Sequence, residues 1–95
     1  MKHCIAVKWN EKVTDKKKNL PEIRQIFGKL LKIDGIFGVE IKENIIDRPN
    51  RFDLLICIEM DKEILPIYDE SVPHKEWKEK YSDFIDKKAI FDLEE

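Results

Sequence analysis

Two side chains in the second half of the chain could carry proton-transfer chemistry. His74 follows a Val-Pro pair and precedes a helical stretch, and histidine exchanges protons readily near neutral pH. Tyr68, slightly upstream, could polarise a carbonyl oxygen by donating a hydrogen bond to it. The alternative is that His74 only caps the following helix and that Tyr68 is a core aromatic whose hydroxyl reaches water. The residue types alone leave both interpretations open.

His3 and Asp92 form a second candidate set, near the two ends of the sequence. His3 shares one face of an alternating segment with Ile5 and Val7, so it is either a hydrogen-bonded histidine at a sheet end or part of a pocket wall. Asp92 could face the same pocket. His3, His74 and Asp92 could also form a metal site, but three scattered residues support one only weakly. With no P-loop, GxGxxG or GxSxG motif present either, we expect no metal and no cofactor.

Charge and composition argue against two classes of partner. Charged residues make up 40% of the 95 residues, with 18 Lys and Arg against 20 Asp and Glu, and the pI is about 5.7. A nucleic-acid-binding domain is normally basic, so we interpret the single run Lys16-Lys17-Lys18 as a solvated helix entrance. No apolar stretch approaches the roughly 18 residues of a membrane span. We expect neither nucleic-acid nor membrane partners.

The cysteines and the opening segment indicate a cellular compartment. Cys4 and Cys57 each lie inside an apolar, strand-like run, with no CxxC pair and no zinc-ligand spacing. We expect both to be buried and reduced. The opening MKHCIAVKW alternates as a strand does and is not a signal peptide. A cytoplasmic protein is therefore expected.

Four alternating segments predict β-strands. They cover residues 2–9, 37–44, 51–60 and 88–93. The first and third are apolar on both faces at their centres, which is typical of strands covered on two sides. In the second, the pattern places Phe37, Val39 and Ile41 inward.

Helical spacing fills the first and the third gaps between these strands. Asn19 at a cap position and an early Pro21 predict a helix that ends near Gly35. An alternative is one longer helix from Asp15, kinked at Pro21.

The second helical region opens at Asp61. Residues 72–74 are predicted to interrupt it, and a third helical stretch contains Trp77.

The order β-α-β-β-α-β predicts an α+β, ferredoxin-like fold, with residues 1–95 as one domain. Its four-stranded antiparallel sheet would carry helices on one face only. The other face would then expose an apolar surface that a monomer rarely tolerates. We therefore expect a homodimer that pairs through its sheets.

Several short segments, in order along the chain, resemble the stress-responsive A/B barrel (Dabb) family of the dimeric α/β-barrel superfamily. They are His3, residues 35–39 (GIFGV), residues 51–54 (RFDL), Tyr68, Pro73-His74 with Trp77, and residues 90–92 (IFD). The resemblance spans essentially the whole chain. It implies a homodimer in which two sheets form a barrel ringed by helices.

The resemblance also implies roles for particular residues. A plant cyclase of this fold closes a linear polyketide by aldol chemistry, and its catalytic His and Tyr match His74 and Tyr68. Its supporting positions match His3 and Asp92, and Ile5 and Phe27 would complete a ligand pocket. The chain departs from the family at residues 71–74, where SVPH replaces a His-Pro-x-His turn.

Three functions follow from this reading. The first is a dimeric, stress-linked protein that binds a small, mostly apolar molecule between sheet and helices. The second is a cofactor-free cyclase, lyase or isomerase with His74 as general base and Tyr68 as electrophile. The third is a purely structural oligomer.

Overall fold

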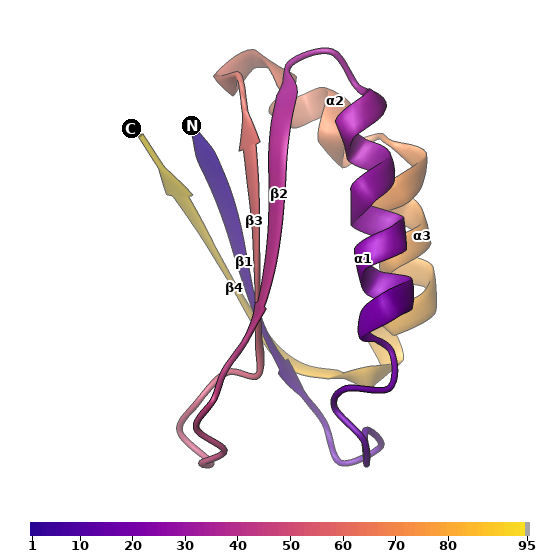
Figure 1. Cartoon of the computed structure of the whole chain (residues 1–95), viewed down its shortest axis with the longest axis vertical. Helices are drawn as coiled ribbons and strands as arrows, with labels where there is room; N and C mark the ends of the chain where they lie inside the picture. The colour runs from indigo at the N-terminus through magenta and orange to yellow at the C-terminus, as the bar shows by residue number, and fades with distance from the viewer. Residues whose placement is uncertain (95) are drawn as a thin grey trace.

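A computed structural model describes residues 1–94 and shows one sheet with helices packed on one face (Figure 1). The strands are β1 (Lys2–Trp9), β2 (Ile36–Glu43), β3 (Leu54–Met60) and β4 (Ile85–Leu93), and the α-helices are α1 (Leu20–Gly28), α2 (Leu65–Asp69) and α3 (Val72–Tyr81). Short 3₁₀ segments adjoin the helices: η1 (Lys29–Lys32), η2 (Lys62–Ile64) and η3 (Ser82–Phe84). The predicted α+β, ferredoxin-like βαββαβ order is confirmed.

The sheet places the two ends of the chain side by side. Its strand order is β2-β3-β1-β4, and every neighbouring pair is antiparallel. Figure 1 shows both termini at one end of the sheet, because β1 and β4 are neighbours. At the centre of the sheet, five helix-facing side chains are at most 3% exposed: Ile5 and Val7 on β1, and Leu54, Ile56 and Ile58 on β3.

Strand β2 departs from its predicted alternation at its start. The sequence pattern placed Phe37 inward, but Phe37 is 59% exposed and Ile36 is buried instead. The register against β3 shifts between Ile36 and Gly38. This irregularity adds a residue to β2 and turns Phe37 out of the core. Val39 and Ile41 pack with the core as predicted.

Helix α1 begins at the predicted place without the predicted cap. Asn19 precedes it, but its side chain makes no capping hydrogen bond. Residues 16–19 form turns, so the alternative of one longer helix from Asp15 is wrong. Pro21 stands in the first turn, where its missing N–H costs no hydrogen bond. The buried face consists of Ile23, Ile26 and Phe27.

Gly35 lies in the turn that leads into β2 and does not terminate the helix, although the sequence pattern predicted that it would. The helical segment ends with Lys32, and Gly35 follows with a φ of 94°, in the left-handed region that favours glycine. A Cβ at this position would collide with the side chain of Ile64. The turn into β2 therefore approaches η2 closely, and only glycine, which has no Cβ, leaves space for the Ile64 side chain.

Helix α3 starts earlier than the sequence pattern indicated. Residues 72–74 were predicted to interrupt the helix, but they form its first turn. The hydroxyl of Ser71 accepts a hydrogen bond from the backbone N–H of His74 at 3.3 Å. Ser71 is thus the cap, and the alternative that His74 caps this helix is wrong.

The sheet face turned away from the helices carries an apolar stripe. Cys4 pairs with Phe91 and Cys57 across the neighbouring strands, and Ala6 pairs with Leu55. Phe91 is 66% exposed and Leu55 is 40% exposed. The stripe covers β1, β3 and β4, whereas β2 adds an ion pair between Lys42 and Glu40. The predicted uncovered apolar face is therefore present on three of the four strands.

Within residues 1–94, no helix combines the length and the apolar character of a membrane span.

Candidate functional site

The first and last strands bring His3 and Asp92 together. The two residues are directly opposite in the β1–β4 register, and His3 Nδ1 lies 2.6 Å from Asp92 Oδ1. His3 is buried, whereas the Asp92 side chain is 44% exposed. An ionised carboxylate can only accept, so the proton of this bond belongs to Nδ1. Nε2 is then the nitrogen left for other partners.

Tyr68 lies between the two histidines. Its ring centroid is 5.2 Å from that of His3 and 4.7 Å from that of His74. The residue is 1% exposed, and its hydroxyl has no hydrogen-bond partner within residues 1–94. Burial, with a smaller contribution from the charge of Asp69, raises the pKa of Tyr68 well above its ordinary value. The hydroxyl is therefore a neutral donor with nothing to donate to.

His74 is oriented by the backbone that joins α2 to α3. Its Nδ1 lies 2.9 Å from the backbone carbonyl oxygen of Asp69. A carbonyl accepts, so Nδ1 carries the proton and Nε2 is the acceptor nitrogen. The N-cap bond from His74 N–H to Ser71 fixes the start of the helix that carries the ring. Both histidines thus use Nδ1–H for anchoring and keep Nε2 for other partners.

The arrangement has the elements of carbonyl chemistry. Tyr68 can donate to a carbonyl oxygen, and an unprotonated His74 Nε2 beside it can accept a proton from the neighbouring carbon. The Asp92 carboxylate holds His3 on the other side of the tyrosine ring. The sequence-predicted residues His3, Tyr68, His74 and Asp92 therefore form one connected row.

The other two predicted pocket residues are part of the packed core. Ile5 is 3% exposed and Phe27 is fully buried. Phe27 packs edge-on against Trp77, with ring centroids 5.2 Å apart. Both belong to the same buried apolar cluster as Tyr68.

A surface hollow of about 280 Å³ opens at one end of the row. Asp92 contributes to its wall, together with Met1, Lys62, Leu93 and Glu94. Tyr68 and His74 do not line it. The row from Asp92 through His3 to Tyr68 runs from this hollow into the buried interior.

A metal centre is not assembled at this site. Among residues 1–94, no three His, Cys, Asp or Glu side chains gather closely enough to hold an ion, so His3, His74 and Asp92 do not form a metal site.

Sequence reasoning missed Ser71 and the Asp69 carbonyl as the groups that orient His74. Serine just before a helix is a recognisable N-cap signal for the first, whereas a backbone carbonyl leaves no signal in the sequence.

No protein-family profile and no curated protein matches the sequence. Solved structures do match. A dimeric protein of unknown function with a ferredoxin-like fold from Bacteroides fragilis has a TM-score of 0.81 at 17% identity, over 99% of this chain and 94% of that one. A Dabb family protein with a ferredoxin-like fold from Mesorhizobium loti has a TM-score of 0.74 at 14% identity, over 99% and 94%.

An enzyme is also among the similar structures. A hydroxynitrile lyase from Passiflora edulis has a TM-score of 0.70 at 12% identity, over 95% of this chain and 87% of that one. Identities this low establish the fold alone. It is the ferredoxin-like fold that the Dabb resemblance implied, and a Dabb family protein is among the structures that share it.

Proposed function

We propose that this chain is a homodimeric protein of the stress-responsive A/B barrel type that binds a small, largely apolar molecule at Tyr68. The observation that carries the proposal is the buried Tyr68 hydroxyl, which lacks a partner within residues 1–94. A buried donor left unpaired costs about 1–3 kcal/mol. A ligand oxygen that accepts a hydrogen bond, such as a carbonyl oxygen, would remove that cost.

The surroundings of the hydroxyl favour an apolar ligand body. The rings of His3 and His74 flank Tyr68, and Ile5 and Phe27 belong to the same buried cluster. These neighbours offer dispersion contacts and few hydrogen bonds. The ligand would carry one accepting oxygen and a compact apolar or aromatic group.

The apolar stripe on the other sheet face supports the homodimer. Phe91, Leu55 and Leu93 are 66%, 40% and 40% exposed, and two sheets packed face to face would bury them. The similar protein from Bacteroides fragilis is described as dimeric.

The proposal places the dimer in the cytoplasm. There the two free thiols, Cys4 and Cys57, would stay reduced.

A matched pair of small molecules tests the role of Tyr68. Acetophenone and ethylbenzene share a phenyl ring, but only the ketone accepts a hydrogen bond. We expect the wild-type protein to bind acetophenone about tenfold more tightly in NMR titrations, and Tyr68→Phe to lose most of that preference. Amide spectra confirm that the variant is folded.

Two results would contradict the proposal. One is equal binding of both compounds by the wild-type protein, which is the result expected if a fixed water satisfies Tyr68. The other is an unchanged ketone preference in Tyr68→Phe. Absence of any binding would leave the purely structural oligomer.

The second candidate is a cofactor-free cyclase, lyase or isomerase. It is favoured by the Nδ1 contact of His74 with the Asp69 carbonyl, which directs Nε2 toward other partners beside Tyr68. Tyr68 would donate to a substrate carbonyl oxygen while His74 Nε2 removes a proton from the adjacent carbon. The resulting enolate could be reprotonated or attack a second carbonyl group of the same molecule.

Hydrogen exchange measures this proton transfer directly. In D₂O, the methyl protons of acetophenone exchange through the enolate, and NMR follows their loss. We expect the wild-type protein to accelerate exchange and His74→Gln to abolish the acceleration. Lys75→Gln, at an exposed neighbouring position, is the control and should keep the wild-type rate. Equal rates for wild type and His74→Gln would remove His74 from the catalytic role.

A further inference from the structure

A second hollow lies at the opposite end of the sheet–helix layer from His3. Its volume is about 690 Å³, and Trp9 from the end of β1 lines it together with Ile41 and Leu54 from the core. Two side chains of the β2–β3 loop, Ile45 and Ile46, line it as well and are 93% and 41% exposed. This apolar lining would gain stability from being covered.

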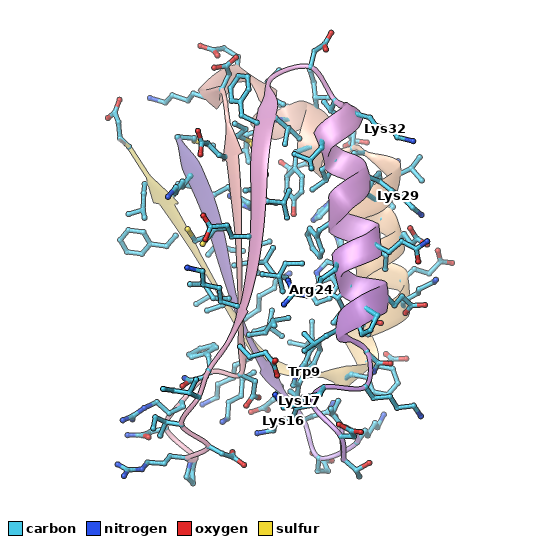
Figure 2. The ribbon with its side chains drawn as sticks, in the orientation of Figure 1. Trp9, Lys16, Lys17, Arg24, Lys29 and Lys32 are labelled. Carbon is cyan, nitrogen blue, oxygen red and sulfur yellow. The ribbon has the colours of Figure 1, made fainter. Side chains whose placement is uncertain are left out.

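The cations around this hollow differ in whether they already have a carboxylate partner. Three lysines in its wall already hold carboxylates: Lys16 with Asp47 and Asp53, Lys17 with Glu43, and Lys42 with Glu40. Arg24 on α1 is the fourth lining cation, and it has no carboxylate partner within residues 1–94. Figure 2 shows Arg24 projecting from α1 toward the sheet, with Trp9 and Lys17 beyond it toward the same end of the molecule.

We propose that this hollow binds a small monocarboxylate with an apolar tail. Arg24 would hold the carboxylate, and the tail would lie over Ile45 and Ile46. A guanidinium group presents parallel N–H donors that match the two oxygens of a carboxylate, which makes such pairs both strong and directional. The tail would cover the exposed isoleucines, so both halves of the ligand have a counterpart in the hollow.

The acidic side chains around the hollow select against ligands of higher charge. Asp47, Asp53 and Glu43 line it, each already paired with a lysine. A phosphate group or a nucleotide would bring further negative charge against these carboxylates, whereas Arg24 offers a single unpaired positive charge. Charge complementarity therefore favours a monoanion.

This site is separate from the one at Tyr68. His3 and Trp9 lie on the same face of β1, at its two ends, about 20 Å apart at roughly 3.3 Å per residue. Tyr68 packs against His3, and the hollow contains Trp9. A ligand in the hollow would not reach the tyrosine hydroxyl, and each site can be tested without the other.

Octanoate and octan-1-ol are the probes, because they share a tail and differ in the carboxylate. Calorimetric titration of the full chain at pH 7 and low salt is expected to show Arg24→Gln weakening octanoate binding at least tenfold. The affinity for octanol should change less than about twofold. Lys32→Gln removes the same charge at an exposed position outside the hollow, and it should leave octanoate binding within about twofold of wild type.

Several outcomes would overturn the proposal. They are no octanoate binding by the wild-type protein at millimolar concentration, equal binding by wild type and Arg24→Gln, and displacement of octanoate by millimolar inorganic phosphate. A tenfold loss in Tyr68→Phe would place octanoate at the other end and overturn it too. An unchanged affinity in Tyr68→Phe supports it.

Discussion

The two ends of the sheet–helix layer follow opposite plans, although the same strand, β1, contributes to both. At the His3 end, the rings of His3 and His74 flank Tyr68, which is 1% exposed and whose hydroxyl has no hydrogen-bond partner among residues 1–94. At the Trp9 end, the layer opens into a hollow of about 690 Å³ bordered by ion pairs. The Tyr68 hydroxyl at one end is neutral and buried, whereas the hollow at the other end is charged and open.

This difference determines what each end can recognise. Where burial excludes water, a missing hydrogen bond is costly, so the closed end would select a ligand by the position of one oxygen. Where water solvates the charged groups, an ion pair contributes less than it would in the interior. The open end would therefore bind through covered apolar surface plus one charge, and more weakly in salt.

The largest expected effect tests whether the closed interior extends to Phe27. This ring is fully buried and packs against Trp77, so Phe27→Ala should leave a cavity and lower the free energy of unfolding by about 3–5 kcal/mol. Urea titration at fixed protein concentration measures it. Leu31→Ala, at a position 51% exposed on η1, is the control and should cost under about 1 kcal/mol. A loss that small for Phe27→Ala would mean that the interior is already open there.

A smaller effect is expected at Gly35, which shapes the closed end alone. Gly35→Ala would place a side chain at φ 94° and against Ile64, which should cost about 2 kcal/mol or more. The amide signals of η2 and α2 should shift, whereas the indole signal of Trp9 should stay. Equal shifts at both ends would show that the two ends are not independent.

The fold could be predicted because its information is local. Alternating apolar residues around Ile5 and Ile56 mark strands, and the residues that stand between the strands mark helices. Local patterns failed where a neighbouring strand decides the conformation. The register shift that exposes Phe37 depends on the pairing of β2 with β3, and no spacing within β2 encodes it.

The two candidate sites differ in how much of each could be predicted from the sequence. The contact between His3 and Asp92 joins residues 89 positions apart, so it follows from strand order and from family resemblance, not from a motif. The hollow at Arg24 requires the path of the β2–β3 loop, which no periodic pattern in the sequence encodes. The anchoring of His74 by the Asp69 carbonyl requires coordinates, because every residue has a carbonyl.

Removing the unpaired hydroxyl should stabilise the closed end. Without ligand, Tyr68→Phe deletes a buried donor that has no partner and is expected to raise the free energy of unfolding by about 1 kcal/mol. Tyr81→Phe is the control: the Tyr81 hydroxyl donates to Glu22, so its removal should lower stability. A destabilised Tyr68→Phe would reveal a bound partner, such as an ordered water, in the free protein.

The smallest expected effect is the pH dependence of stability that comes from Glu22. Hydrogen bonds from Tyr81 and then Lys80 hold the pKa of Glu22 below its ordinary value of 4.5 in the folded protein. Because the folded pKa is the lower one, the stabilisation is complete above the unfolded pKa and disappears as pH falls through the folded value. Wild type should therefore lose more stability than Glu22→Gln between about pH 6 and pH 3, measured by urea titration at each pH. The difference should be small, since the Glu22 side chain is 45% exposed and solvent screens it. Parallel pH curves would mean that these contacts contribute nothing, and that the acid response of the protein comes from other carboxylates.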